Sequence, residues 1–247
     1  MVFFEFSDRI KRFFAFSHTE LRDLAIATVI IGFVFSFGDW GGESVDIFVG
    51  IRHFIITLFL AAISLFFHEA AHRVMALLIG YKAEFKLWWG GLVASLIIVF
   101  ISDGKIPLAL PGGVVNAILV RQRLGEFRYG LNYWENGLIA LYGPLANLAL
   151  AFFAKVGLAI FPESYFLNQL LFLNIIMAIC TMLPIPPLDG ISTFFGSRVV
   201  YILAFIGILA SGVLIYFTSI LPAILGGILL MIIGTILYYL AFEQTPE

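Results

Sequence analysis

The chain has 247 residues, of which 62% are hydrophobic and only 12% are charged. A soluble domain is about 45–50% apolar and about 25% charged, so this composition excludes an ordinary water-soluble protein and indicates a polytopic membrane protein. The formal net charge of −2 suggests no nucleic-acid partner, and the single cysteine, Cys180, excludes a disulfide within the chain.

The first residues combine phenylalanines with basic side chains, a pattern typical of a segment that lies in the membrane interface. We therefore expect an interfacial segment over residues 1–23 and a first apolar span over 24–37. A second apolar run, 47–79, is longer than the roughly 20 residues that cross a bilayer. Gly80 is well placed to end this helix.

Residues 81–133 do not divide into simple spans. Trp88 and Trp89 indicate a membrane interface. The apolar stretch 92–101 is too short to span a bilayer, and the stretch 106–119 is interrupted by prolines and glycines. We expect these two stretches to form a hairpin that dips into the membrane, where surrounding protein covers its backbone.

The rest of the chain contains clearer apolar runs. Further spans are expected over 137–161, 165–183, 199–217 and 220–242. The predicted fold class is therefore an all-α polytopic membrane protein with about six transmembrane helices and a membrane-dipping hairpin between the second and the third. After the interfacial segment, residues 24–243 are expected to form a single transmembrane domain.

Positive charge is distributed unevenly between the loops. Basic residues cluster before the first span, after the second, and before the third and fifth, whereas the alternate loops carry almost none. Because cytoplasmic loops are enriched in Lys and Arg, we expect a multi-pass protein of the cell membrane with both termini in the cytoplasm. This orientation places the last part of the second span toward the cytoplasm.

The second span carries an H-E-x-x-H pattern, HEAAH at 68–72. His68 and His72 are four positions apart on one helix face, so both imidazoles can reach one metal ion. Glu69 can reach a water held at the metal, which is the arrangement of zinc metalloproteases. Ionisable groups inside an apolar segment are costly and indicate a functional role. Arg73 is expected to be a snorkelling or ion-paired side chain.

A catalytic zinc site takes three protein ligands, so a third side chain is required at similar depth. His53 lies about four turns before His68, too far along the same helix. Asp189 follows a run with three prolines, which cannot continue a helix and is expected to be extended. Such a segment can project a carboxylate toward another helix, so Asp189 is the predicted third ligand and Asp103 is the alternative.

These features resemble the site-2 proteases, a family of intramembrane zinc metalloproteases, in their compact prokaryotic and archaeal form. Three motifs carry the resemblance, in the family's order and separation: HEAAH at 68–72, GPLAN at 143–147 and PIPPLDG at 184–190. The similarity covers roughly residues 54–190. The resemblance implies one Zn²⁺ per chain, bound by the two histidines and the aspartate, with the glutamate as general base.

The resemblance also assigns supporting residues. Gly143 and Asn147 match positions that pack the metal-binding helices and line the site, and Asn174 matches an asparagine of the span before the aspartate. The family typically has Phe-Asn-Leu before the first proline of its aspartate motif, whereas this chain has Cys-Thr-Met at 180–182. Thr181 therefore offers a hydroxyl where the family offers an amide to hold substrate or oxyanion.

The implied function is hydrolysis of peptide bonds in transmembrane segments of membrane protein substrates. The substrate helix must unwind locally, and the dipping hairpin could offer it an edge strand around 108–114. The alternatives are a metal-ion transporter that uses the same ionisable residues and a non-proteolytic membrane binding protein of the same fold. Transporters often contain internal repeats, and none is visible here. The expected partners are a transmembrane substrate and the bilayer, and the sequence carries no signal for an oligomeric state.

Overall fold

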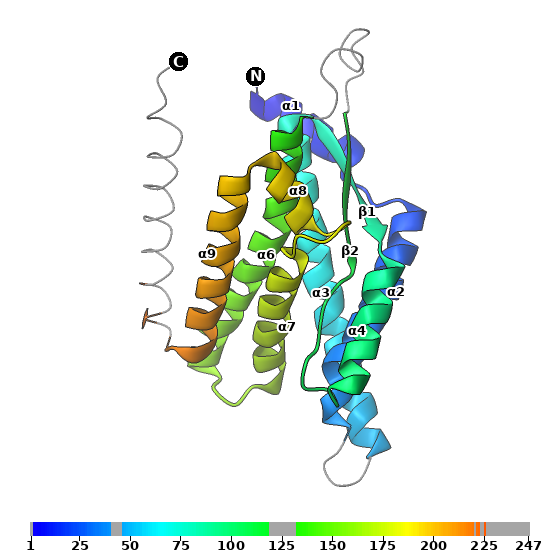
Figure 1. Cartoon of the computed structure of the whole chain (residues 1–247), viewed down its shortest axis with the longest axis vertical. Coiled ribbons are helices and arrows are strands. Elements are labelled where there is room, and N and C mark those ends of the chain that lie inside the picture. Colours follow the sequence, from blue (N-terminus) through cyan, green and yellow to red (C-terminus); the bar gives the residue numbers. More distant parts are fainter. Residues whose placement is uncertain (1, 41–45, 119–131, 220, 223–224, 226–247) are drawn as a thin grey trace.

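A computed structural model describes residues 2–40, 46–118 and 132–219, together with 221, 222 and 225. This part of the chain is mostly helical, with long helices packed side by side (Figure 1). The helices are α1 (Val2–Phe13), α2 (His18–Ser36), the 3-10 turn η1 (Phe37–Asp39), α3 (Ile47–Ile79), α4 (Trp89–Ile101), α6 (Tyr133–Ile160), α7 (Tyr165–Thr181), α8 (Asp189–Gly196) and α9 (Arg198–Phe217). The strands are β1 (Tyr81–Leu87) and β2 (Gly112–Ile118).

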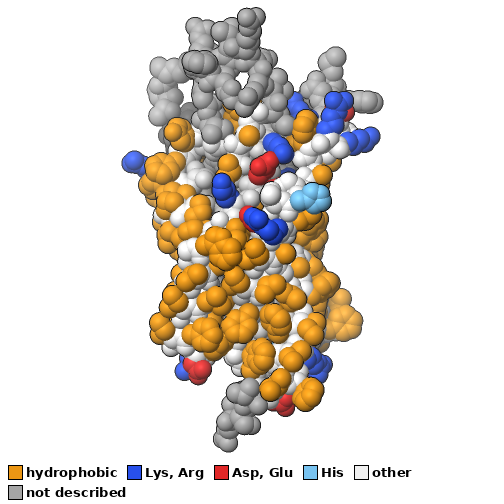
Figure 2. Space-filling view, turned by 90° about the vertical axis from the view of Figure 1, so that its right-hand side faces the viewer, with side chains coloured by type: hydrophobic (Ala, Val, Ile, Leu, Met, Phe, Trp, Pro, Cys, Tyr) orange, Lys and Arg blue, Asp and Glu red, His pale blue; other side chains and the backbone are white. Residues whose placement is uncertain are grey.

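Four of the described helical segments are long and apolar enough to cross a membrane, namely α2 with η1, α3, α6 and α9. On the face shown in Figure 2, charged side chains gather in the upper part and at the lower end, and hydrophobic side chains cover the stretch between them. This distribution is the one that a multi-pass membrane protein requires. The helices α4 and α7 are apolar but shorter, and the expected span 220–242 lies almost entirely outside the described residues.

The helix predicted over the second apolar run is confirmed over its full length, because α3 runs from Ile47 to Ile79. Its end is set by Gly80, which has a left-handed backbone (φ 108°) and donates its N–H to the Ala76 carbonyl. Helix α3 occupies the centre of the fold and packs against α2, α6, α7 and β1. The metal motif is therefore carried by a helix that is supported by several neighbouring elements.

The first span begins earlier than the sequence predicts. Helix α2 starts at His18 rather than at residue 24, because Ser17 and Glu20 form a capping box. The Ser17 hydroxyl accepts the Glu20 N–H, and the Glu20 carboxylate accepts the Ser17 N–H. Glu20, which the sequence places in the interfacial segment, therefore lies on a candidate membrane-spanning helix.

Of the two stretches predicted to form a hairpin, 92–101 lies in helix α4 and 106–119 contains strand β2, whose partner β1 precedes the predicted hairpin. The two strands correct the expectation of an entirely helical fold. Strands β1 and β2 pair antiparallel, with Tyr81 opposite Ile118 and Leu87 opposite Gly112, and α4 connects them. Side chains of β1 alternate between buried and more exposed positions, the period of a half-buried strand. Entry of this segment into the membrane stays a prediction.

The sheet is joined to α6 at one end, and its two strands approach each other closely at the other. At one end, the Tyr81 hydroxyl donates to the Glu135 carboxylate of α6, and burial together with this acidic partner raises the pKa of the Tyr81 phenol. At the other end, Gly112 has φ 152°, and a Cβ there would lie 2.1 Å from the Lys86 carbonyl oxygen. Only glycine fits this approach, so it fixes the register of the two strands.

Candidate metal centre

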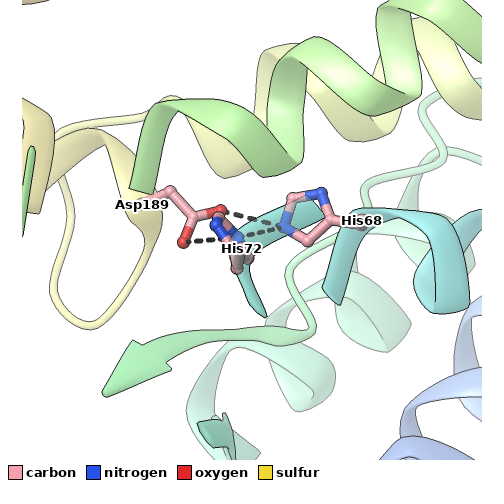
Figure 3. A group of neighbouring side chains, drawn as sticks. All are labelled: His68, His72 and Asp189. Atoms are coloured by element: carbon pink, nitrogen blue, oxygen red, sulfur yellow. Dashed lines mark hydrogen bonds and ion pairs between the residues drawn. The ribbon is translucent and has the colours of Figure 1, made fainter. Parts of the chain in front are cut away.

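Three ionisable side chains meet at the middle of the fold. His68 and His72 lie one turn apart on α3, and Asp189 is the first residue of α8 (Figure 3). The His68 Nε2 atom lies 3.0 Å from Asp189 Oδ2 and 3.1 Å from His72 Nε2, and His72 Nε2 lies 3.5 Å from Asp189 Oδ1. None of the three residues is more than 2% exposed.

The arrangement passes a geometric test for a metal ion. In tetrahedral zinc sites with bonds of about 2.0–2.1 Å, ligand atoms lie about 3.3 Å from one another. The three separations here, 3.0, 3.1 and 3.5 Å, lie around that value. Two imidazole nitrogens and a carboxylate oxygen also form a donor set that suits zinc.

Hydrogen bonding alone leaves this group poorly satisfied. His72 Nδ1 lies 2.8 Å from the Ile139 carbonyl oxygen, which can only accept, so Nδ1 carries the proton and Nε2 has a free lone pair. Asp189 Oδ1 has no hydrogen-bond donor among the described residues. Lone pairs of His72 and Asp189 therefore face the same small space, which is the environment that a buried cation would satisfy.

The Asp189 carboxylate is held in place by packing around the proline run. The backbone before it forms successive turns, closed by bonds from Ile185 N–H to Leu183 and from Leu188 N–H to Ile185, so it is not the extended segment that the sequence predicts. A Cβ on Gly190 would lie 2.1 Å from the Met182 carbonyl oxygen, so the run folds tightly back on the end of α7.

A further contact fixes α8 itself. The Thr193 hydroxyl lies 3.3 Å from the Gly137 carbonyl oxygen of α6 and 3.0 Å from the Asp189 carbonyl oxygen. This hydroxyl therefore connects the first turn of α8 to α6. The alternative ligand, Asp103, lies in the turn after α4 with φ 51° and is not part of the metal-ligand group.

Helix α6 lies directly against the two imidazoles. A Cβ on Gly143 would come within 2.3 Å of His72 Nε2 and 2.6 Å of His68 Nε2, so only glycine fits. One turn further along α6, Asn147 is fully buried, and neither atom of its amide group has a hydrogen-bond partner among the described residues. In the GPLAN motif, Gly143 thus brings backbone without a side chain against the histidines, and the Asn147 amide is unpaired.

The two remaining predicted residues lie on α7 and are both fully buried. Asn174 donates to the Ser64 hydroxyl at 2.9 Å and so connects α7 to α3, whereas its Oδ1 has no partner among the described residues. The Thr181 hydroxyl donates its only proton to the Met177 carbonyl at 3.0 Å. That proton is committed within α7, so the geometry gives no support to Thr181 as a donor to substrate.

Glu69 completes the site. Its side chain is buried at 1% exposure, and its Oε2 atom accepts no hydrogen bond from the described residues. Arg73 Nη1 lies 3.9 Å from Oε2. The sequence indicated ion pairing of Arg73 but not its partner Glu20, which lies 53 positions earlier on α2.

The fold and these residues define a class: a multi-pass membrane protein with a buried His, His and Asp metal group beside a glutamate, as in zinc metalloproteases. Comparison with known proteins agrees. The chain is 33% identical over 181 residues, covering 72% of this chain and 84% of the relative, to "Putative zinc metalloprotease MJ0611" of Methanocaldococcus jannaschii. The chain belongs to the same zinc metalloprotease family. No family model and no solved structure matches it.

Proposed function

We propose that the chain is an intramembrane zinc metalloprotease of the site-2 protease kind, which hydrolyses peptide bonds within transmembrane segments of other membrane proteins. The observation that carries this proposal is the position of the metal group. His68, His72 and Asp189 are buried together among helices that are apolar enough to span a membrane. A catalytic group at that depth is suited to a substrate that is itself in the membrane.

The proposed chemistry divides between the metal and Glu69. A zinc ion held by His68, His72 and Asp189 would polarise the scissile carbonyl and lower the pKa of the attacking water. Glu69 accepts the proton of that water through its unpaired Oε2 atom and passes it to the leaving amine nitrogen. The Ile139 carbonyl holds the His72 ring in the tautomer that leaves Nε2 free as a ligand.

Strand β2 is the proposed substrate-docking element. A helical substrate must unwind, because its carbonyl groups are already hydrogen-bonded. Among the described residues, β2 pairs with β1 along one edge, and no strand covers its other edge. A Cβ on Gly113 would lie 1.7 Å from the Pro187 carbonyl oxygen, so β2 contacts the segment that carries Asp189. An unwound substrate added to the free edge would therefore lie next to the metal group.

The proposed environment follows from the charge distribution. We infer a multi-pass protein of the cell membrane with both termini cytoplasmic, a transmembrane protein as substrate, and no nucleic-acid partner. The metal group would then be nearer the cytoplasmic side, from which water enters. Proteolysis in proteoliposomes with substrate added in each orientation would test this assignment, because only one orientation is expected to be cleaved.

The proposed function is tested with purified protein and a quenched fluorescent transmembrane peptide that carries a central, helix-breaking Gly-Pro pair. Glu69→Gln is expected to lower cleavage about 10²- to 10⁴-fold while zinc content stays at the wild-type level. If no transmembrane peptide is cleaved and Glu69→Gln instead blocks metal flux into liposomes, the chain is a metal transporter. If neither activity is found while zinc is bound, it is a binding protein of the same fold.

A further inference from the structure

A second group of buried charges lies beside Glu69. Arg73 and Glu20 are 2% and 4% exposed, and the Arg73 guanidinium donates through Nη2 to the Glu20 carboxylate. A buried guanidinium that loses its partner is strongly destabilising, so this pairing determines where the Arg73 side chain lies. Arg73 is also four positions after Glu69 on α3, which places the two side chains on one helix face.

Glu20 is held by donors from three different elements. Besides Arg73 of α3, its Oε1 atom accepts the Phe85 N–H of β1 at 2.9 Å, and its Oε2 atom accepts the Ser17 N–H at the start of α2 at 2.8 Å. One face of the guanidinium is covered by the Phe16 ring, whose centroid lies 3.7 Å from Arg73 Cζ. The stretch from Phe16 to Glu20 therefore encloses the Arg73 side chain.

Arg73 and Glu69 lie close together but do not form a hydrogen bond. Arg73 Nη1 and Glu69 Oε2 both lack a hydrogen-bond partner among the described residues, yet they are only 3.9 Å apart. A charge-assisted bond has a length of about 2.7–2.9 Å, so a movement of about 1 Å would create it. The pairing with Glu20 keeps the guanidinium just beyond bonding distance of Glu69.

The hydrogen bonding also shows which carboxylate Arg73 pairs with. The guanidinium donates to Glu20, whereas Glu69 lies just beyond bonding distance. If Glu20 loses its charge, the nearest carboxylate available to Arg73 is Glu69.

We propose that Glu20 is a positioning residue that acts through Arg73: it holds the guanidinium away from Glu69 and so leaves the general base free to accept the proton of water. The inference rests on the proposed function, because it concerns the role of Glu69 in hydrolysis. It makes the first turn of α2, which the sequence places in the membrane interface, part of the machinery that sets the state of the active site.

The test is a rescue experiment on the full chain with the fluorescent transmembrane peptide. In Glu20→Gln, Arg73 is expected to bond to Glu69, so that kcat falls about 10- to 100-fold while KM and zinc content are unchanged. In the double variant Glu20→Gln with Arg73→Met, the competing guanidinium is gone, and kcat is expected to return to within about fivefold of the wild type. If the ion pair only stabilises the fold, kcat of the double variant is expected to be no higher than that of Glu20→Gln.

The matched control is Asp8→Asn, which removes the carboxylate from an Arg and Asp pair of the same type that is exposed on α1. Its kcat is expected to equal that of the wild type. Should the double variant fail to fold, Arg73→Met alone is measured per zinc-loaded molecule. A loss beyond about tenfold would show that Arg73 assists the base, and the proposal would be wrong.

The outcomes separate the inference from the function on which it rests. If wild type cleaves the peptide and Glu69→Gln does not, the proposed function stands. The inference alone then fails if Glu20→Gln is as active as wild type, loses its zinc, or is not rescued by Arg73→Met. If wild type cleaves no transmembrane peptide, the proposed function and the inference are both overturned.

Discussion

The two sides of the metal group are built in different ways. On α3, the helix alone sets the spacing of His68 and His72, because residues four positions apart share a face. On the other side, Asp189 is positioned by tertiary packing, through β2, α6 and the end of α7. The spacing of the histidines thus follows from a single helix, whereas the position of Asp189 depends on contacts between several elements. Packing therefore determines the position of Asp189, whereas it acts on the histidines where α6 lies against their rings.

Two glycine substitutions test this comparison directly, and they carry the largest expected effects. Gly143→Ala would put a Cβ 2.3 Å from His72 Nε2, and Gly113→Ala would put one 1.7 Å from the Pro187 carbonyl oxygen. Both are expected to lower zinc affinity by about 10-fold or more and the unfolding free energy by about 1–3 kcal/mol. Zinc titration followed by thermal unfolding measures both quantities.

The control is Gly207→Ala on α9, where an added Cβ meets no atom within 4 Å. It is expected to leave zinc affinity unchanged, because the added methyl group displaces nothing. If Gly143→Ala and Gly113→Ala bind zinc as tightly as Gly207→Ala, the metal group does not depend on these close approaches.

Proline substitutions in β2 separate substrate docking from metal binding. Neighbouring strand residues turn their N–H groups to opposite edges, so only one of Val114→Pro and Val115→Pro removes a donor from the free edge. The variant that affects the free edge is expected to lower cleavage of the transmembrane peptide about tenfold and to keep its zinc and its melting temperature. Equal cleavage by wild type and by both variants would exclude strand addition at β2.

The third prediction concerns the contact that fixes α8. Thr193→Val removes the hydroxyl that bridges the Gly137 and Asp189 carbonyl oxygens, with little change in side-chain volume. The expected loss of unfolding free energy is about 1 kcal/mol, with a several-fold decrease in zinc affinity. A zinc titration monitored by tryptophan fluorescence checks the affinity. An unchanged value would mean that α8 is positioned without this bond.

The smallest effect is expected at Thr181, the position where the resembled family has an asparagine. Its hydroxyl proton is donated to the Met177 carbonyl within α7, so Thr181→Val is expected to change kcat by less than about threefold. A loss of tenfold or more at unchanged KM would show that the hydroxyl turns toward substrate during the reaction.

The sequence predicts the histidine side of the metal group well. The bounds of α3, the ending at Gly80 and the grouping of the two histidines follow from helical periodicity, and the structure confirms the helix and its end. Asp189 was reachable too, because a carboxylate that follows a proline run in an apolar region is uncommon.

Contacts between residues that are far apart in the sequence are harder to predict. Strand β1 shows period-2 alternation over only seven residues, and its partner lies beyond α4, so the pairing had no local signal. The bond from His72 to Ile139 uses a backbone carbonyl, which any residue provides. The pair of Arg73 and Glu20 joins residues 53 positions apart, and only the spacing of Glu69 and Arg73 hinted at a charge network.

The central claim is that His68, His72 and Asp189 hold one zinc ion, and metal analysis of purified protein tests it most directly. Wild type is expected to bind one zinc per chain, and Asp189→Ala is expected to lose it while the chain remains folded. Asp103→Ala, which removes the alternative ligand outside the group, is expected to retain one zinc per chain. Full zinc occupancy in Asp189→Ala, or its loss in Asp103→Ala, would contradict the account.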